Sequence, residues 1–531
     1  MQVFATAPMV SDKITAAMLI LLPILIFTLA AFLLLMVEFF RLKFRYSWLV
    51  AVSGAMLALV AVFLWQIRFP DTFFLPAWQP VSVFNYRPHW RIDSVSWPYA
   101  MGIAALTLAV VLTSPVRNEN RPFIWAGTLL LAAFGISAAA AADPLTLVMV
   151  WAVFDLTELA TMIGSVNEEN SIRNIILAYT MRLLGMGFLI LAIEAQQSAH
   201  LPLEFADFSQ VSGLLLLMGT GLRLGILPLR LPYQSESVLR RGFGTTLRLI
   251  SAAISLSVLG KIPVSSISSP LQPYLLILTA LPALYAGWMW LRSSDELIGR
   301  PFWVLGLAAL SIATTLLGNP LSSAGWGIAL LAGGLLFLYS ARQRRLIWLI
   351  LPGLWALSGL PFSATAIVWS NNTTTWFFTL PFLLAQSLFL AGFLRHALHP
   401  GESSFESQEK WGRIIYPVGL FLLAVVVVLC GLWGWEGAAR VGQWGQSLLA
   451  SVIGAAFFLL AVRFLHHSAR TPAQWGDVIR LNWLYRSIDA FSHILENIAL
   501  FLTNLLEGEG GILWSFLLLV LLVTLIASGG R

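Results

Sequence analysis

Long apolar segments recur from one end of the chain to the other, with short polar connections between them. A segment of about 18 to 24 apolar residues is long enough to cross the hydrocarbon core of a bilayer as an α-helix. The pattern therefore predicts an all-α, polytopic transmembrane helix bundle of about 14–17 helices. The predicted helices lie at residues 16–40, 47–66, 97–115, 122–140, 144–164, 175–193, 211–229, 245–262, 272–291, 301–318, 323–341, 346–370, 375–395, 413–434, 444–463 and 511–528.

The composition supports a membrane location. Of the 531 residues, 58% are hydrophobic and 11% are charged. This charged fraction is about half that of a typical soluble domain. The first apolar segment is too long for a signal peptide and ends at Glu38 and a basic cluster, so we expect it to be retained as a helix. The single cysteine, Cys430, cannot supply a disulfide framework or a cysteine ligand set for zinc or an iron–sulfur cluster.

Basic residues are distributed unevenly between the two sets of connections. The connections that follow odd-numbered predicted helices hold most of the 31 Lys and Arg residues. The positive-inside rule then places these connections in the cytoplasm and both termini outside, in what we expect to be a bacterial cytoplasmic membrane. The formal charge of +6 thus reflects topology and does not indicate a nucleic-acid partner. The even-numbered connections hold only Arg68, Arg87, Arg91, Lys261 and Arg440.

Two stretches depart from the pattern of short connections. Residues 67–96, rich in aromatic residues and proline, predict a long loop on the outer face. Residues 470–507 carry apolar side chains at spacings of three or four, opposite charged ones. That spacing is typical of an amphipathic helix, which we expect to lie along the cytoplasmic surface before a final crossing.

Two carboxylates are predicted at membrane depth. Asp143 and Pro144 have the sequence of an N-cap and first-turn pair that opens the helix at 144–164. At 1.5 Å per residue, Asp155 then lies roughly 17 Å along this helix, near the bilayer centre. Glu158 follows three residues later, on the same helix face. An ionisable group at this depth costs at least a few kcal/mol, so both are candidates for a function.

Three arginines, Arg182, Arg223 and Arg248, fall within the next three predicted helices. With the two carboxylates they could form an acid–base row that carries protons or cations. The alternative is that Asp155 and Glu158 only neutralise arginines in structural ion pairs, which persist without transport.

Prolines interrupt two predicted helices. Pro228 and Pro232 lie at the end of the seventh predicted helix, and Pro361 lies within the twelfth. In a membrane bundle such a proline produces either a simple kink or a break that frees backbone carbonyls to line an ion or water path. We predict broken helices 7 and 12.

In order and spacing these features resemble the proton-conducting antiporter-like subunits shared by respiratory complex I, membrane-bound hydrogenases and Mrp-type cation/proton antiporters. The segment Arg91 to Ser96 is similar to the pattern before the family's third helix, and Phe154-Asp155 is similar to its aromatic–glutamate pair in helix 5. The run from Arg223 to Pro232 has the spacing of the family's helix 7, and Gly359-Leu360-Pro361 matches its broken helix 12.

Several positions depart from the family pattern. Asp155 is one methylene shorter than the family's glutamate, and Arg223 and Arg230 stand in place of a lysine and a histidine. Arginine keeps its proton at physiological pH, so Arg223 cannot relay a proton as a lysine can. The family's charged residues in helices 8 and 12 have no counterpart near Ala253 and Trp369.

The resemblance covers about residues 90 to 400 and divides the chain into four parts. These are N-terminal helices with the outer loop (1–90), an antiporter-like transmembrane core (91–400), additional transmembrane helices (401–470), and the surface amphipathic helix with a terminal crossing (471–531).

The resemblance implies a membrane subunit that takes part in proton or sodium translocation coupled to electron transfer or cation exchange. Its implied partners are other membrane subunits and the lipid bilayer. It would bind no cofactor of its own, as at most a non-redox subunit of an NADH:quinone oxidoreductase-like or hydrogenase-like complex. Two alternatives stay open: a non-conducting structural subunit of such a complex, and an unrelated polytopic transporter or membrane enzyme that uses Asp71, His89 and Asp93 of the outer loop.

Overall fold

The computed structural model describes residues 10–41, 46–75, 87–117, 121–165, 169–227, 229, 241–267, 270–369, 376–399, 403–435, 438, 444–464 and 490. Fifteen α-helices lie within them: α1 (Val10–Phe39), α2 (Ser47–Leu64), α3 (Ser96–Thr113), α4 (Pro122–Ala140), α5 (Pro144–Ile163), α6 (Glu169–Ser198), α7 (Gln210–Leu224), α8 (Arg241–Ser257), α9 (Gln272–Arg292), α10 (Glu296–Leu316), α11 (Ser322–Leu338), α12 (Leu351–Ser358), α13 (Trp376–Ala397), α14 (Lys410–Trp433) and α15 (Trp444–Phe464).

These helices confirm the predicted fold class. Each of the predicted helices up to residue 463 corresponds to one of them. Within the described residues, 12 helices are long and apolar enough to cross a membrane, and α7 and α11 are shorter apolar helices. The predicted amphipathic helix at 470–507 and the final crossing at 511–528 lie outside the described residues.

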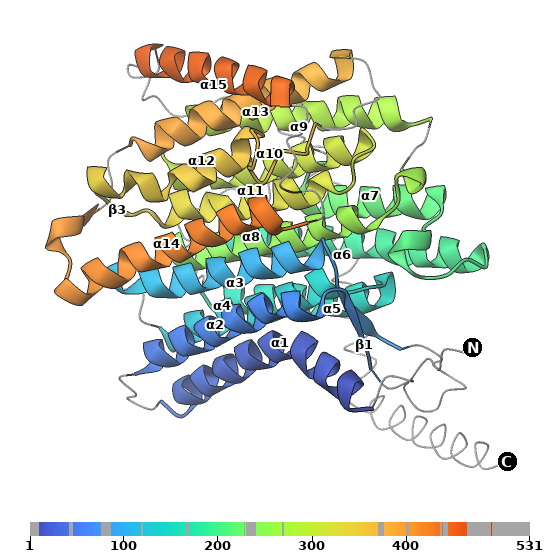
Figure 1. Ribbon diagram of the computed structural model, residues 1–531, viewed down its shortest axis with the longest axis horizontal. Helices are drawn as coiled ribbons and strands as arrows, with labels where there is room; N and C mark the ends of the chain where they lie inside the picture. The colour runs from blue at the N-terminus through green and yellow to red at the C-terminus, as the bar shows by residue number, and fades with distance from the viewer. Residues whose placement is uncertain are drawn as a thin grey trace, which may run out of the picture. The chain divides into compact units, whose positions relative to one another are not determined.

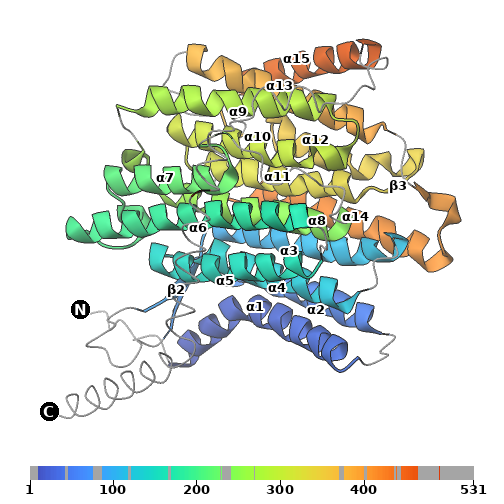
Figure 2. The ribbon, with the colours of Figure 1, turned by 180° about the vertical axis from the view of Figure 1, so that it is seen from behind.

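The core of the bundle is formed by α3, α8 and α11, in which every residue is buried. Helix α8 packs against α3, α4 and α11, while α1 packs on α2 and α4, and α15 packs on α13 (Figure 1). Helices α5, α6 and α7 follow one another on one side of this core, and Figure 2 shows them as neighbours.

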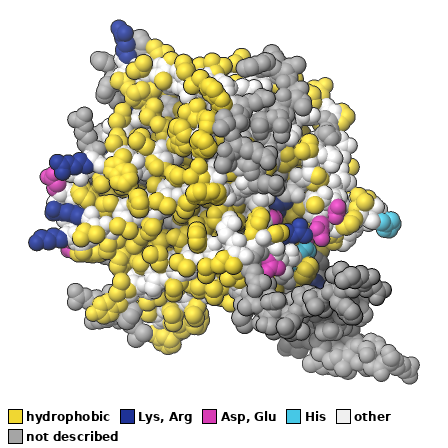
Figure 3. Space-filling model, in the orientation of Figure 1, with side chains coloured by type: hydrophobic (Ala, Val, Ile, Leu, Met, Phe, Trp, Pro, Cys, Tyr) yellow, Lys and Arg dark blue, Asp and Glu magenta, His cyan; other side chains and the backbone are white. Residues whose placement is uncertain are grey.

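The surface of the bundle carries a broad apolar band. In Figure 3 hydrophobic side chains cover the middle of the face that is drawn, and charged side chains of both signs lie towards its edges. On α1, Leu25, Leu29 and Phe32 are all more than half exposed. Such large exposed apolar side chains are stable only against lipid or another apolar surface. The chain is an integral, multi-pass membrane protein.

The predicted outer loop contains a β-hairpin that the sequence pattern did not reveal. Strand β1 (Asp71–Phe74) pairs in antiparallel register with β2 (His89–Ile92). The hairpin is fixed by tertiary contacts: the Trp90 indole donates to the Ser137 hydroxyl on α4 at 3.0 Å and stacks with Phe73. A second small sheet joins β3 (Ala341–Arg342) in parallel to β4 (Ser403–Ser404).

Two helices end at glycines in the left-handed conformation. Helix α7 ends before Gly225 (φ 73°), and Ile226 N–H then donates to the Gly221 carbonyl at 2.8 Å. Helix α12 ends before Gly359 (φ 71°), inside the range predicted for one long helix, which confirms its break. Because glycine adopts positive φ without a Cβ clash, these glycines end the helices. Pro361 lies in the turn beyond Gly359, whereas Pro228 and Pro232 lie outside the described residues.

Candidate functional site

Helix α5 carries the two predicted carboxylates on its buried face. The Asp143 side chain accepts a hydrogen bond from Thr146 N–H at 2.9 Å, which confirms the predicted N-cap. The helix then continues unbroken to Ile163. Asp155 and Glu158 are 1% and 2% exposed, whereas Leu156 between them is 54% exposed. The helical period therefore turns both carboxylates away from lipid and towards the neighbouring helices.

Asp155 is held by a two-pronged ion pair with Arg223 of α7. Arg223 donates from Nη1 to Asp155 Oδ2 at 2.7 Å and from Nη2 to Oδ1 at 2.9 Å. The guanidinium carbon lies 4.0 Å from the centre of the Trp151 ring, and Nε donates to the Ser255 hydroxyl of α8 at 3.4 Å. Planar, bidentate geometry of this kind is specific to arginine, and a lysine could not reproduce it.

Two glycines bring α6 and α7 close enough for Arg223 to reach Asp155. A Cβ on Gly185 of α6 would lie 2.8 Å from the Gly219 carbonyl oxygen and would overlap the Arg223 side chain. A Cβ on Gly219 would lie 2.7 Å from the Gly185 carbonyl oxygen. Small residues facing each other permit this close backbone approach in membrane helices. Arg223 lies in the last turn of α7, where the helix dipole also favours a cation.

Arg182 of α6 links the two carboxylates. Its Nη1 forms an ion pair with Glu158 Oε2 and lies 3.7 Å from Asp155 Oδ1. A small hollow beside it is lined by both carboxylates, Arg182 and Tyr179, together with Leu159, Met162 and Ile175, and has room for about one water molecule.

The structure thus joins four of the five predicted ionisable residues, Asp155, Glu158, Arg182 and Arg223, which we call the α5–α7 charge cluster. Arg248, the fifth, is buried on α8, the helix that supplies Ser255.

The break after α12 is lined by neutral side chains. Thr365 Oγ1 donates to the Ala356 carbonyl at 2.7 Å and accepts from Gly359 N–H at 2.9 Å. Gln386 of α13 donates to the Leu357 carbonyl at 2.9 Å and accepts from the Trp369 indole at 2.9 Å. These bonds satisfy carbonyls that a broken helix would otherwise leave for an ion.

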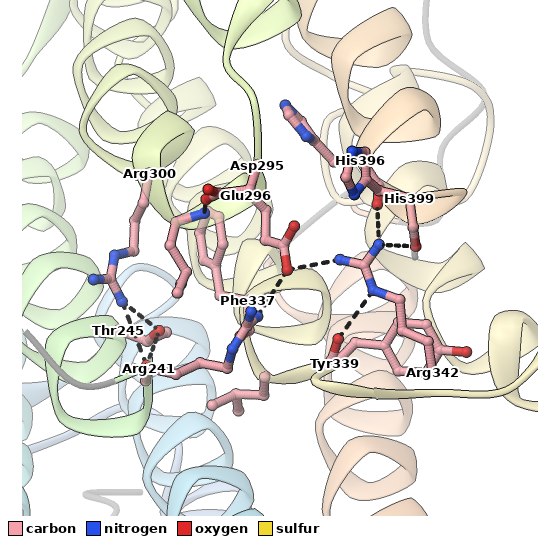
Figure 4. Close-up of polar contacts among 12 residues, drawn as sticks. Arg241, Thr245, Asp295, Glu296, Arg300, Phe337, Tyr339, Arg342, His396 and His399 are labelled. Atoms are coloured by element: carbon pink, nitrogen blue, oxygen red, sulfur yellow. Dashed lines mark hydrogen bonds and ion pairs between the residues drawn. The ribbon is translucent and has the colours of Figure 1, made fainter. Parts of the chain in front are cut away.

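A second buried charge cluster lies at the arginine-rich end of the helices and is drawn in Figure 4. Glu296, the first residue of α10, accepts from Arg241 of α8 at 2.8 Å and from Arg342 of β3 at 2.6 Å. Arg241 also donates to the Phe337 carbonyl at 2.8 Å, and Arg342 donates to the His396 carbonyl at 2.7 Å. We call this set the Glu296 hub. It ties together the starts of α8 and α10 and the ends of α11 and α13.

The hub was not predicted from the sequence. Arg241 and Arg342 fall in polar connections between predicted helices, where they indicated only topology, yet both side chains are less than 10% exposed. The sequence signal at this site was the acidic pair Asp295-Glu296. Asp295 caps α10 by accepting hydrogen bonds from the Leu297 and Ile298 N–H groups. Acidic residues are expected at a helix start for local reasons, so the long-range role of Glu296 was not visible.

The outer-loop residues proposed for the enzyme alternative have structural partners. His89 Nδ1 lies 3.0 Å from Asp143 Oδ2, and Asp93 Oδ1 accepts from the backbone N–H groups of Val95 and Ser96. Asp71 accepts from Thr72 N–H at 2.8 Å. Across the part of the chain that the structure describes, no group of three or more His, Cys, Asp or Glu side chains is placed to hold a metal ion.

Comparison with known proteins gives matches in structure alone. No protein-family model and no curated protein sequence matches the chain. A chain of the Mrp complex from Dietzia sp. DQ12-45-1b superposes with a TM-score of 0.69 at 13% identity, over 98% of this chain. This chain spans only 63% of the length of that protein.

Two further structures match along nearly their whole length. A chain of the membrane-bound sulfane sulfur reductase, an archaeal respiratory membrane complex, gives a TM-score of 0.63 at 13% identity, covering 96% of this chain and 100% of that one. A chain of respiratory complex I from Thermus thermophilus gives 0.60 at 19% identity, covering 82% and 99%. At these identities the comparisons establish the fold, and the resemblance to antiporter-like subunits is confirmed at that level.

The close contact of α6 and α7 can be tested by substitution of Gly185. Gly185→Ala places a methyl group against the Gly219 carbonyl and Arg223. We expect a loss of about 1–3 kcal/mol from overpacking, which exceeds the roughly 1 kcal/mol that alanine gains over glycine in a helix. The measurement is the thermal unfolding midpoint in detergent. Gly187→Ala, on the same helix with nothing within 4 Å of the new Cβ, is the matched control and should be neutral or stabilising.

The Glu296 hub predicts a large effect of Glu296→Gln. The neutral amide leaves Arg241 and Arg342 without their shared counter-charge, and breaking a buried ion pair costs about 3–5 kcal/mol. Denaturant unfolding of the purified protein measures the loss. The exposed Glu406→Gln is the control, and equal stabilities of the two variants would show that Glu296 does not hold the hub together.

Proposed function

We propose that this chain is an antiporter-like membrane subunit of an energy-converting complex. It takes part in the translocation of protons or sodium ions, coupled through its partner subunits to electron transfer or cation exchange. The α5–α7 charge cluster carries this proposal, because it places two carboxylates and two guanidiniums in contact inside an apolar bundle. The fold shared with chains of the Mrp complex, sulfane sulfur reductase and complex I supports it.

The chemistry of the cluster suits an ion that binds and leaves. A carboxylate can take up a proton or hold a cation, and a neighbouring guanidinium that stays charged changes the affinity of that carboxylate when it moves. The hollow beside Glu158 and Arg182 has room for a water molecule next to these groups. A purely structural set of ion pairs would not need this space, and it is often replaceable by apolar residues.

The pathway that we propose is partial. Helices α5 to α8 supply the ionisable row, including the buried Arg248. The break of α12 is bridged instead by the neutral side chains of Thr365 and Gln386. We therefore assign translocation to the α5–α8 half of the chain. By the positive-inside rule we orient the end that holds the Glu296 hub towards the cytoplasm.

The proposal predicts that Asp155→Asn abolishes ion translocation while the protein still reaches the membrane. Asparagine keeps the shape and an acceptor oxygen for Arg223 but removes the negative charge that balances the cluster. The measurement is ion uptake into native membrane vesicles energised by the parent complex, with membrane abundance determined in parallel.

Asp207→Asn, at an exposed site just before α7, serves as the control and should transport normally. Unchanged translocation in the Asp155→Asn protein would remove the cluster from the mechanism and favour a non-conducting structural subunit.

A further inference from the structure

The two arginines of the α5–α7 charge cluster are held in different ways. The Arg223 side chain is 1% exposed, forms a bidentate ion pair with Asp155, and lies over the Trp151 ring. The Arg182 side chain is 11% exposed and lines the hollow, which Arg223 does not. Arg223 is therefore held on several sides, whereas Arg182 borders a hollow that has room for about one water molecule.

The two carboxylates both line the hollow but differ in their contacts with the arginines. Both oxygens of Asp155 accept hydrogen bonds from Arg223, so a proton on either oxygen would weaken one of these two hydrogen bonds. Glu158 meets Arg182 through Oε2. The Nη1 atom of Arg182 that makes this contact has a second carboxylate nearby, because Asp155 Oδ1 lies 3.7 Å away. Arg182 can thus exchange one acceptor for the other through a small displacement.

Because neither guanidinium loses its proton at physiological pH, any proton that the cluster carries must sit on a carboxylate. We propose that Glu158 is the proton-binding carboxylate of this cluster, that Arg182 is its movable counter-ion, and that the Asp155–Arg223 pair is a fixed electrostatic frame. This inference rests on the proposed function, since it names the group that carries the proton within the same site.

The step is simple and balances in charge. A hydronium ion donates a proton to the Glu158 carboxylate: one of its O–H bonds breaks, a new O–H bond forms on Glu158, and a water molecule is released. The four-residue cluster changes from neutral to a charge of plus one. Arg182 then loses its attraction to Glu158 and shifts towards Asp155 Oδ1. When the proton leaves, Glu158 is again an anion and draws Arg182 back. Arg223 stays bonded to Asp155 throughout.

The groups that surround Glu158 are consistent with this division of roles. Helix α4, which packs on α5, contains no ionisable residue. Among the described residues, the ionisable groups that line the hollow with Glu158 are Asp155 on α5 and Tyr179 and Arg182 on α6, and Arg223 on α7 is bound to Asp155. Among these groups, Asp155 is the only other carboxylate that could hold the proton. A comparison of a Glu158 variant with an Asp155 variant therefore shows which of the two carboxylates binds it.

Infrared difference spectroscopy of the full chain in lipid vesicles, recorded as the pH is lowered, tests the inference without any transport assay. A protonated carboxyl group gives a C=O stretching band that an ionised one lacks. We expect a titrating band in the wild-type protein that is lost in Glu158→Gln, kept but shifted in Glu158→Asp, and kept in Asp155→Asn. Glu194→Gln, which removes an exposed glutamate of α6, is the matched control and should keep the band.

A band kept in Glu158→Gln would overturn the inference, and its loss in Asp155→Asn would then place the proton on Asp155. If Asp155→Asn does not fold, the Gln and Asp variants of Glu158 with the Glu194 control still decide the question. Failure of the proposed function is a separate result, because a band lost in Glu158→Gln would stand even in a protein that translocates no ion.

Discussion

The bidentate ion pair between Arg223 and Asp155 is the interaction on which the arrangement of α5, α6 and α7 depends. A lone charge at this depth would cost several kcal/mol, and here each charge is satisfied by the other. The ion pair requires α6 and α7 to meet at Gly185 and Gly219, and Arg223 lies two residues before Gly225, where α7 ends. Backbone geometry and electrostatics therefore support the same arrangement of α5, α6 and α7.

The ends of α7 and α12 have different surroundings. Beyond α7 the ionisable row continues to α8 through Ser255, whereas the break after α12 is bridged by the neutral groups of Thr365 and Gln386. The end of α7 is thus next to charged groups, whereas the end of α12 is next to neutral ones. The Glu296 hub fits such a division, because it ties α8 on the charged side to α11 and α13 on the other.

Most helices of the bundle could be predicted from the sequence because the bilayer strongly constrains the length and apolarity of the helices that cross it. The N-cap at Asp143 fixed the phase of α5, so the buried face of Asp155 and Glu158 could be predicted from helical geometry. Arg182 and Arg223 could be identified as partners because charges inside apolar helices must pair.

The remaining features depend on contacts between distant segments. The β1–β2 hairpin is held by the contact of Trp90 with α4, and the sequence pattern alone did not predict it. The Glu296 hub brings together residues that the sequence shows only as connection charges. The sequence marked the interruptions of helices 7 and 12 by prolines, and the structure shows that the described parts, α7 and α12, end at Gly225 and Gly359 in the left-handed region. Which arginine meets which carboxylate also required the structure.

The central claim is that this chain works as one subunit of a larger energy-converting membrane complex. Purification of the tagged, full-length protein from its native membrane in gentle detergent, followed by mass spectrometry of the proteins that accompany it, tests this most directly. The account predicts stoichiometric co-purification of other antiporter-like or redox membrane subunits. A protein that purifies alone as a monomer, at native abundance and still folded, would contradict it and point to a free-standing transporter or membrane enzyme.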